Sequence, residues 1–218
     1  MIIEFTGVPC SGKSDVSHEL AKILREQGFS VCEKQYELSH SGNSKNRIIT
    51  KIASCFLYGL KHPKKTIDYY FSIGSVRLWM NYIYLLSHNC KSKICILEQG
   101  YLQFIGSFFD NIEINAQEAD LLFKKLMPQA DVIQVFVSAS KETVLNRAKS
   151  REDKPFFMQT EAPEAALDYA FIASETLNKI WCKNKGDTKF ISISNEENNA
   201  QHTVAKNVFE KLKQRELL

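Results

Sequence analysis

Five short apolar runs, spaced widely along the 218-residue chain, constrain its fold more than any other feature. They are residues 1–6, 29–33, 93–98, 131–137 and 189–194. Four of the five are nearly continuous hydrophobic stretches, which is typical of strands covered on both faces. Between the runs lie longer segments with helical spacing, such as residues 13–28, where Val16 and Leu20 fall on one face. Strands that alternate with helices predict a parallel sheet with helices on both faces.

The composition and charge of the chain fit one globular domain over residues 1–218. Hydrophobic residues make up 44% and charged residues 24% of the sequence, so the chain can bury a substantial core. The 28 basic and 25 acidic residues leave a net charge of +3, which is too small to indicate nucleic acid or an anionic membrane as the main partner. We therefore expect neither nucleic acid nor a membrane as a partner.

The first residues and the cysteines indicate a cytoplasmic protein. The opening sequence, MIIEFTGVPC, contains no basic region, long apolar stretch or cleavage site of a signal peptide. The most apolar window, residues 78–87, is too short to cross a bilayer. The six cysteines are scattered without a CxxC pair, which favours reduced thiols over a disulfide framework or a zinc site. We expect a soluble chain in the cytoplasm.

Residues 7–14, GVPCSGKS, match the pattern G-x-x-x-x-G-K-[ST] in full and stand between the first apolar run and the first predicted helix. The two glycines let the backbone curl so that its N–H groups point at one anion, and the helix N-terminus adds its dipole. Lys13 would reach the β- and γ-phosphates of a nucleotide, and Ser14 would hold Mg²⁺. The motif therefore predicts a phosphate-binding loop in which Cys10 is a spacer and not a nucleophile. Its members are Gly7, Val8, Pro9, Cys10, Ser11, Gly12, Lys13 and Ser14.

Residues 184–187, NKGD, match the N-K-x-D motif with which GTPases read guanine. In GTPases that motif closes a hydrophobic strand, whereas here it follows an amphipathic segment and precedes the last apolar run. The chain also contains no D-x-x-G sequence. We therefore interpret NKGD as a polar turn, with Gly186 ending the preceding helix.

Charged residues at the ends of two other predicted elements are further candidates for the site. Glu98 ends the third apolar run, where a carboxylate could face Mg²⁺ through water, and Gln99 follows it. Arg147 and Arg151 are four residues apart on a helix predicted over residues 141–152, so they share one face. Guanidinium groups suit the spread charge of a transferring phosphoryl group. These residues predict a metal contact and a catalytic arginine pair.

The long connection between the second and third runs predicts a helical insertion over about residues 38–92, broken at Pro63. At its start, Glu33 and Glu37 could accept a proton from an acceptor hydroxyl. Within it, Arg47 and Arg77 could instead hold an acceptor phosphate. Both sets of residues are present, so a hydroxyl and a phosphate acceptor both stay open.

Taken together, these motifs resemble the nucleoside and nucleotide kinase branch of P-loop proteins, which includes thymidylate and deoxynucleoside kinases. The resemblance implies a three-layer α/β/α fold whose five parallel strands have the order 2-3-1-4-5, with the insertion receiving the acceptor. It also implies a lid over about residues 147–162 whose arginines, Arg147 and Arg151, touch the phosphates of ATP. By position, the loop at 194–199 would hold adenine, which makes Asn195 a candidate nucleotide contact. Such kinases are commonly homodimers.

One stretch departs from that family. Thymidylate kinases carry D-R-[YH] after the third strand and deoxynucleoside kinases carry E-R-S, whereas this chain has Glu98-Gln99-Gly100. Thymidylate-kinase-like proteins of unassigned substrate are more similar here, and Gln99 becomes a candidate acceptor contact. The resemblance implies an ATP- and Mg²⁺-dependent kinase with a nucleotide or nucleoside-like acceptor. A kinase of a sugar or another small metabolite, or a non-catalytic nucleotide-binding regulatory module, remains open.

Overall fold

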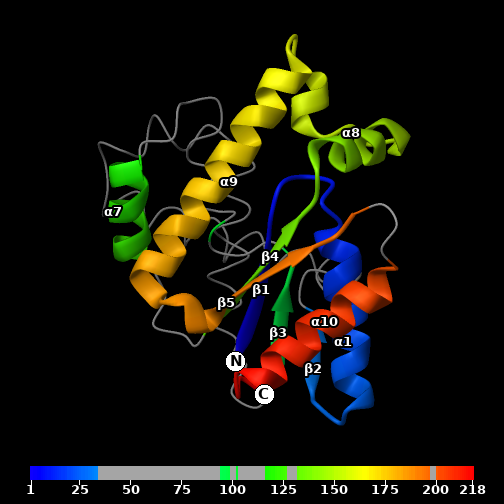
Figure 1. Ribbon diagram of the computed structural model, residues 1–218, viewed down its shortest axis with the longest axis vertical. Helices are drawn as coiled ribbons and strands as arrows, with labels where there is room; N and C mark the ends of the chain where they lie inside the picture. The colour runs from blue at the N-terminus through cyan, green and yellow to red at the C-terminus, as the bar shows by residue number, and fades with distance from the viewer. Residues whose placement is uncertain (34–93, 99–101, 103–115, 127–131, 197–199) are drawn as a thin grey trace, which may run out of the picture.

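Five parallel strands form one sheet in the order β2-β3-β1-β4-β5 (Figure 1). The computed structural model describes residues 1–33, 94–98, 102, 116–126, 132–196 and 200–218. The strands are β1 (Ile2–Thr6), β2 (Val31–Glu33), β3 (Ile94–Leu97), β4 (Val132–Ser138) and β5 (Phe190–Ser194). The predicted parallel sheet and its order 2-3-1-4-5 are confirmed.

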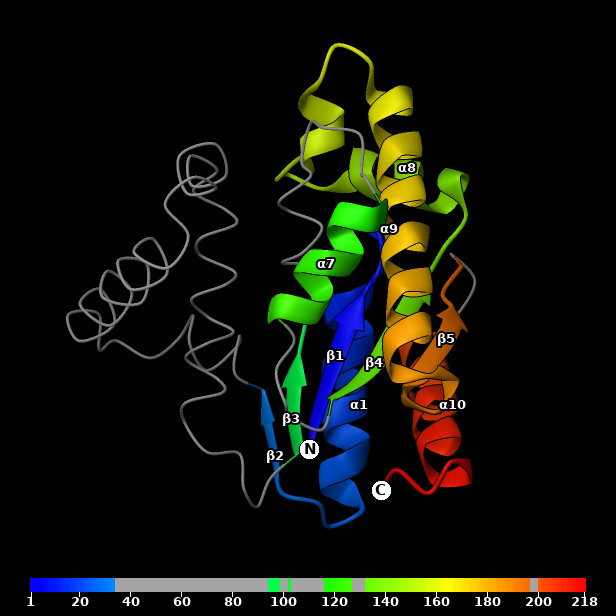
Figure 2. The same ribbon diagram turned by 90° about the vertical axis from the view of Figure 1, so that its left-hand side faces the viewer.

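Helices cover both faces of the sheet (Figures 1 and 2). One face carries α1 (Lys13–Glu26) and α10 (Gln201–Gln214), and the other carries α7 (Ala116–Leu126) and α9 (Pro163–Lys185). Beyond the carboxyl ends of β1 and β4 lie α8 (Lys141–Ser150) and the short 3-10 helix η1 (Phe156–Gln159). The predicted three-layer arrangement is therefore present, and α8 and η1 lie at the edge of the sheet where β1 gives way to the phosphate-binding loop.

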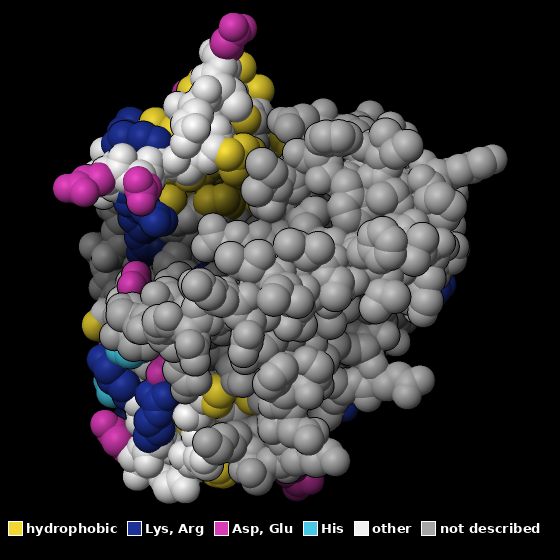
Figure 3. Space-filling model, turned by 180° about the vertical axis from the view of Figure 1, so that it is seen from behind, with side chains coloured by type: hydrophobic (Ala, Val, Ile, Leu, Met, Phe, Trp, Pro, Cys, Tyr) yellow, Lys and Arg dark blue, Asp and Glu magenta, His cyan; other side chains and the backbone are white. Residues whose placement is uncertain are grey.

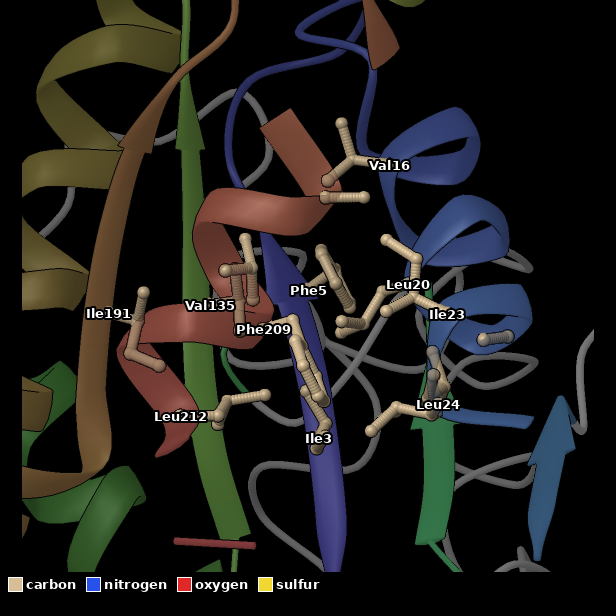
Figure 4. Packing of buried hydrophobic residues seen from close by; sticks show 14 of the residues in the cluster. Ile3, Phe5, Val16, Leu20, Ile23, Leu24, Val135, Ile191, Phe209 and Leu212 are labelled. Atoms are coloured by element: carbon tan, nitrogen blue, oxygen red, sulfur yellow. The ribbon is translucent and has the colours of Figure 1, made fainter. Parts of the chain in front are cut away.

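The face towards α1 and α10 is an apolar core built by the alternation of each strand. Successive residues of a strand point to opposite faces, so Ile3 and Phe5 of β1 point to the same side. Figure 4 shows them between Leu20 and Leu24 of α1 and Phe209 of α10. Because the last two residues of the loop, Lys13 and Ser14, are the first two of α1, this packing sets where the loop ends.

The opposite face of β1 is polar at its centre. Glu4, Thr6 and Gln134 are all buried there. Gln134 on β4 donates from Nε2 to the Thr6 hydroxyl at 2.8 Å and to the Glu4 carbonyl at 3.3 Å. These cross-strand hydrogen bonds tie the last residue of β1 to β4, immediately before Gly7.

Specific residues fix the start of α8 and the end of α9. Ser140 caps α8, with its hydroxyl accepting from the Thr143 backbone N–H at 3.2 Å. Gly186 ends α9 at a φ of +78°, its N–H bonded to the Cys182 carbonyl, and the 3-10 helix η2 (Asp187–Lys189) follows. Asn184 donates to Asp120 on α7 at 2.7 Å. Gly186 ends α9 as predicted, but Asn184 and Lys185 are the last two residues of that helix, so NKGD as a whole is not a turn.

The thiols only partly agree with expectation. Cys10, Cys32 and Cys182 form no disulfide bond. Cys95 on β3 is disulfide-bonded, so the prediction of reduced thiols throughout is wrong at this position. Among the described residues, no helix has the length and apolar character needed to cross a bilayer.

The core predicts a large difference between two truncations of aliphatic side chains. Leu24 is fully buried between α1 and the sheet, whereas Ile172 on α9 is 59% exposed. Leu24→Ala should lower the free energy of unfolding by about 3 kcal/mol through lost burial and a residual cavity. Ile172→Ala should change it by less than about 0.5 kcal/mol. Urea unfolding followed by circular dichroism measures both, and equal effects would contradict the assigned core.

Candidate functional site

The loop between β1 and α1 has glycine at the two positions where a side chain would collide with a neighbouring residue. Gly7 has a φ of +141°, and a Cβ there would lie 2.2 Å from the Val137 carbonyl oxygen of β4. Gly12 has a φ of +88°, and a Cβ there would lie 2.2 Å from Nδ2 of Asn195. Both glycines of the motif are therefore demanded by close neighbours as well as by backbone conformation.

Between the glycines the chain makes a tight turn. The Ser11 N–H donates to the Val8 carbonyl at 3.2 Å, which places Pro9 and Cys10 at the corners. Cys10 has a φ of +65°, a conformation that normally selects glycine or asparagine, while Pro9 suits the preceding corner. Cys10 is buried with its sulfur facing α8. The geometry gives Cys10 a place in the shape of the loop, and its predicted role as a spacer stays a prediction.

The Lys13 side chain lies against the loop from which it emerges. Its Nζ donates to the Gly7 carbonyl at 2.9 Å and to the Val8 carbonyl at 2.8 Å. The first residue of α1 thus curls back over the turn, with its ammonium group centred on the backbone of residues 7 and 8. A single cation inside a glycine-shaped cradle is a suitable site for an anion.

The surroundings of Lys13 alter its titration. Burial lowers the pKa of Lys13 to about 8 from 10.5, with Cys10 and Glu98 raising it and the positive charge of Arg151 lowering it. The ammonium is therefore charged at neutral pH but poorly solvated. A bound anion would replace the lost solvation, which is the electrostatic reason for this site to attract phosphate.

The predicted metal contacts are compatible with Mg²⁺. Ser14 is exposed at the start of α1, and Glu98 is half-buried directly after β3, within electrostatic range of Lys13. Among the described residues there is no group of three or more His, Cys, Asp or Glu side chains that could hold a metal alone. Mg²⁺ usually needs only one or two protein oxygens together with water and substrate phosphates, so one hydroxyl and one carboxylate fit it. The metal roles of Ser14 and Glu98 remain predictions.

Both predicted arginines reach the loop. Nη1 of Arg147 lies 3.2 Å from the Ser11 carbonyl and 3.5 Å from the Cys10 carbonyl, and Nη1 of Arg151 lies 3.8 Å from Sγ of Cys10. Figure 3 shows basic side chains gathered over α8, with acidic ones at their outer edge. Arg151 stands just past the end of α8 in extended conformation, so the prediction that Arg147 and Arg151 share one helical face is wrong. The structure nevertheless brings both to the same turn.

The segment after Arg151 is packed down onto the loop. Phe157 in η1 is fully buried in an apolar cluster with Val8, Val144 and Leu167, while its neighbour Phe156 is 48% exposed. Whether residues 147–162 act as a lid stays a prediction. In this structure the segment is closed against the loop, with Phe157 as its anchor.

Asn195 lies beside the loop at the end of β5. It is completely buried, and its Nδ2 donates to the Ser11 carbonyl at 2.8 Å. Its backbone N–H bonds to the Ser138 carbonyl of β4 at 2.8 Å. Asn195 was expected at the site from its position in the sequence, and it does contact the loop directly, through the backbone carbonyl of Ser11. A contact with adenine remains a prediction.

Glu33 lies apart from the loop. One carboxylate oxygen is 2.8 Å from Nδ1 of His18 and the other is 2.6 Å from Nη1 of Arg25, both on α1. In the sheet Glu33 pairs with Ile96 of β3, and Ile96 pairs with Ile3 of β1. Because Ile3 comes four residues before Gly7, Glu33 lies roughly 13 Å from the start of the loop along the strand direction. These contacts fasten the edge strand β2 to α1, and the predicted role of Glu33 as a base stays a prediction.

Four predicted acceptor residues lie outside the described residues, as does the helical insertion at 38–92. These are Glu37, Arg47, Arg77 and Gln99. A single domain over residues 1–218 remains a prediction. The acceptor side of the site therefore rests on the sequence.

One residue that contributes to the site carried no signal in the sequence. Glu196 lies in the polar stretch SNEENN, and its carboxylate accepts hydrogen bonds from Ser140 and Thr143 at the start of α8. These hydrogen bonds hold the pKa of the Glu196 carboxyl below its usual value. Only knowledge that β4 and β5 are adjacent could have identified it, because Ser140 is 56 residues away.

Comparisons with known proteins agree with this geometry at the level of the fold. No protein-family model matches the sequence, and no curated protein matches it. A deoxyadenosine kinase from M. mycoides with the products dCMP and dCDP superimposes with a TM-score of 0.55 at 16% identity, covering 98% of this chain and 100% of that one. The same kinase with bound dATP gives 0.52 at 13% identity, with the same coverage.

A shikimate kinase from Bacteroides thetaiotaomicron superimposes with a TM-score of 0.51 at 12% identity, covering 100% of this chain and 99% of that one. These likenesses extend over nearly the whole length of both chains. They show that the chain has the α/β fold of P-loop kinases, and the resemblance seen in the sequence is confirmed at that level.

Gly12 and Gly28 have similar backbone conformations, so comparing variants at the two positions separates the effect of backbone conformation from the effect of a close neighbour. Gly28 has a φ of +85° with nothing within 4 Å of an added Cβ, whereas at Gly12 the added Cβ meets Asn195. Gly28→Ala should cost about 1 kcal/mol of stability and leave MgATP affinity unchanged. Gly12→Ala should cost more and weaken MgATP binding by more than about tenfold, because Asn195 must move. Urea unfolding and titration calorimetry test this, and equal behaviour of the two variants would contradict it.

The lowered pKa of Lys13 predicts a pH dependence of anion binding. As the pH rises through about 8, the unliganded chain loses the ammonium charge, so the dissociation constant for MgATP should increase by up to about tenfold per pH unit. Calorimetric titrations from about pH 6.5 to about pH 9.5 measure this. Lys13→Arg, whose side chain stays charged, should show no break near pH 8. A flat profile for the parent chain would contradict the prediction.

Proposed function

We propose that this chain is an ATP-dependent phosphotransferase that passes the γ-phosphoryl group of MgATP to a small-molecule acceptor of nucleotide or nucleoside type. The observation that carries the proposal is the convergence of three cations on one glycine-shaped turn. Lys13 contacts the carbonyls of residues 7 and 8, and Cys10 is contacted by Arg147 from α8 and by Arg151 from just past the end of α8. The P-loop kinase fold supports it.

The chemistry needs positioning and positive charge more than covalent participation. The bond between the γ-phosphorus and the β,γ-bridging oxygen breaks, and a new bond forms from an acceptor oxygen to the same phosphorus. Lys13 would stay near the β- and γ-phosphates and stabilise the negative charge that develops on ADP. Arg147 on α8 and Arg151 just after it would stabilise the equatorial oxygens of the transferring group.

Ser14 and Glu98 are the residues that would hold Mg²⁺, Ser14 by its hydroxyl and Glu98 through water. When bound, Mg²⁺ neutralises charge on the β- and γ-phosphates. Ser14 stands one residue after Lys13 at the start of α1, so its hydroxyl can reach the anion that Lys13 meets. Glu98 approaches from β3, the neighbour of β1 in the sheet.

The acceptor belongs to the part of the site that rests on the sequence. Glu33 and Glu37 are proposed bases for a hydroxyl acceptor, whose proton one of them would accept; for Glu33 this requires an ion pair with α1 to open. Arg47 and Arg77 are proposed contacts for a phosphate acceptor, and Gln99 is proposed to contact either. The Glu98-Gln99-Gly100 sequence argues against the housekeeping thymidylate enzyme.

A kinase of a sugar or another small metabolite is the second candidate, because the shikimate kinase matches over nearly its whole length. A non-catalytic nucleotide-binding regulatory module is the rival from another class. We further propose a cytoplasmic location, a homodimer, and a single domain over 1–218 with its acceptor insertion at 38–92 and its lid at 147–162. Asn195 is proposed to lie near the nucleotide.

Replacing Lys13 tests the donor end of the site. Lys13→Ala should abolish acceptor-dependent ADP formation, a loss of at least about a thousandfold, because the charge that meets the phosphates is gone. The variant should unfold at the same or higher urea concentration than the parent chain, since a poorly solvated ammonium has been removed. Coupled-enzyme assays and urea unfolding measure the two effects. Full activity in a folded variant would overturn the proposal.

An acceptor screen separates the three candidate functions. The chain is incubated with ATP, Mg²⁺ and separate pools of nucleosides, nucleotides and sugars, and ADP is measured in each. ADP formed only with nucleosides or nucleotides supports the first candidate, and ADP formed only with sugars supports the second. Nucleotide binding without acceptor-dependent turnover in any pool would favour the regulatory module.

A further inference from the structure

The carbonyl group of Ser11 receives two side-chain donors from different parts of the chain. Nδ2 of Asn195 lies 2.8 Å from this oxygen, and Nη1 of Arg147 lies 3.2 Å from it. The peptide that carries this carbonyl also carries the N–H of Gly12, on the opposite side of the trans bond. Holding the oxygen therefore fixes the direction of the Gly12 N–H in the phosphate-binding loop.

The residue after Asn195 makes a second set of contacts. The Glu196 carboxylate accepts from the backbone N–H of Ser140 at 3.0 Å, from the Ser140 hydroxyl at 2.9 Å and from the Thr143 hydroxyl at 2.8 Å. The Ser194 hydroxyl also lies 3.2 Å from it. The carboxylate thus caps the N-terminus of α8, where negative charge is favoured by the helix dipole.

Together, the contacts of Asn195, Glu196 and Arg147 form a closed ring that starts and ends at Ser11. The path runs from Ser11 to Asn195, along the chain to Glu196, across to Thr143, one helical turn along α8 to Arg147, and back to Ser11. We propose that Asn195 and Glu196 are positioning residues that complete this ring and so hold the phosphate-binding loop and Arg147 in register for MgATP. The inference rests on the proposed function, because it assumes that the loop binds MgATP.

The ring has a physical consequence that single contacts would lack. Arg147 is a long side chain with many rotamers, and ordering it at one carbonyl is costly unless its helix is already held in place. Glu196 holds the start of that helix. Asn195, the second donor to the Ser11 carbonyl, is itself held in place by the hydrogen bond from its backbone N–H to the Ser138 carbonyl. The cradle is thereby ordered before nucleotide arrives, which lowers the entropy cost of binding.

The ring also accounts for the second glycine of the motif. A Cβ at Gly12 would lie 2.2 Å from Nδ2 of Asn195 and 3.4 Å from Nη1 of Arg147. Both donors therefore pass directly over this residue to reach the carbonyl before it. A side chain at position 12 would displace a member of the ring.

A matched pair of carboxylates at the start of α8 tests the role of Glu196. Glu196→Gln keeps the size of the side chain but removes the charge that its donors meet. Glu142→Gln removes a charge from the same helix turn at an exposed residue. We expect Glu196→Gln to raise the dissociation constant and KM for MgATP about fivefold, the equivalent of one hydrogen bond, with kcat within about twofold. Glu142→Gln should change neither by more than about 1.5-fold.

A cycle of variants tests closure of the ring. Asn195→Ala should also weaken MgATP binding about fivefold, and the double variant should be only slightly weaker, because a ring once opened loses little from a second break. Independent contacts would instead multiply to about 25-fold, which would overturn the ring. If Asn195→Ala does not fold, Asn195→Ser takes its place.

Hydrogen exchange of the nucleotide-free chain keeps this inference separate from the proposed function. Peptides covering residues 7–16 should exchange faster in Glu196→Gln than in the parent chain. Their exchange rates should be unchanged in Glu142→Gln. If the parent chain does not bind MgATP, the proposed function fails, and the exchange data still decide whether the ring exists. Unchanged exchange together with parental MgATP affinity in Glu196→Gln would overturn the ring itself.

Discussion

The close approach of the loop after β1 to its neighbours is the constraint on which the rest of the site depends. At one end, Gly7 passes so near the Val137 carbonyl that no side chain fits. At the other, Gly12 passes beneath the amide of Asn195. Between these points the turn presents its carbonyls to Lys13 on one side and to Arg147 on the other. Lys13, Arg147 and Arg151 all contact this loop, whose backbone conformation depends on the two glycines.

This arrangement concentrates positive charge at a cost that the core must offset. Burial, together with the nearby guanidinium of Arg151, lowers the pKa of Lys13 to about 8. Below that pH the charged lysine destabilises the folded state relative to the unfolded chain, whose lysine titrates near its ordinary value. The apolar layer of α1 and α10 against β1 and β4 compensates, and it begins one turn after the loop. A buried ammonium that has lost its solvation favours a nearby anion.

The predictions that succeeded rest on residues adjacent in sequence or repeating with a regular period. The loop motif, the five strands and the end of α9 at Gly186 are of this kind, because local sterics and alternation decide them. Arg147 and Arg151 were placed together by helical spacing, yet Arg151 lies beyond the helix and reaches Cys10 by an extended backbone. Glu33 ends its strand as predicted, but the sheet register sets it well below the loop, paired with α1. Glu196 was missed because its partners come from a different βα unit.

The sequence alone determined that the chain has the glycine-rich loop of residues 7–14, a parallel sheet of five strands and arginines after the fourth strand, because each is encoded in contiguous residues. Only the tertiary structure decided which side chains hold that loop in shape. The order β2-β3-β1-β4-β5 brings the end of β5 beside the end of β4 and next to the loop that follows β1. Asn195, Glu196 and Arg147 can meet around Ser11 for that reason, since contacts between distant segments are fixed by strand adjacency and register and leave no local pattern in the chain.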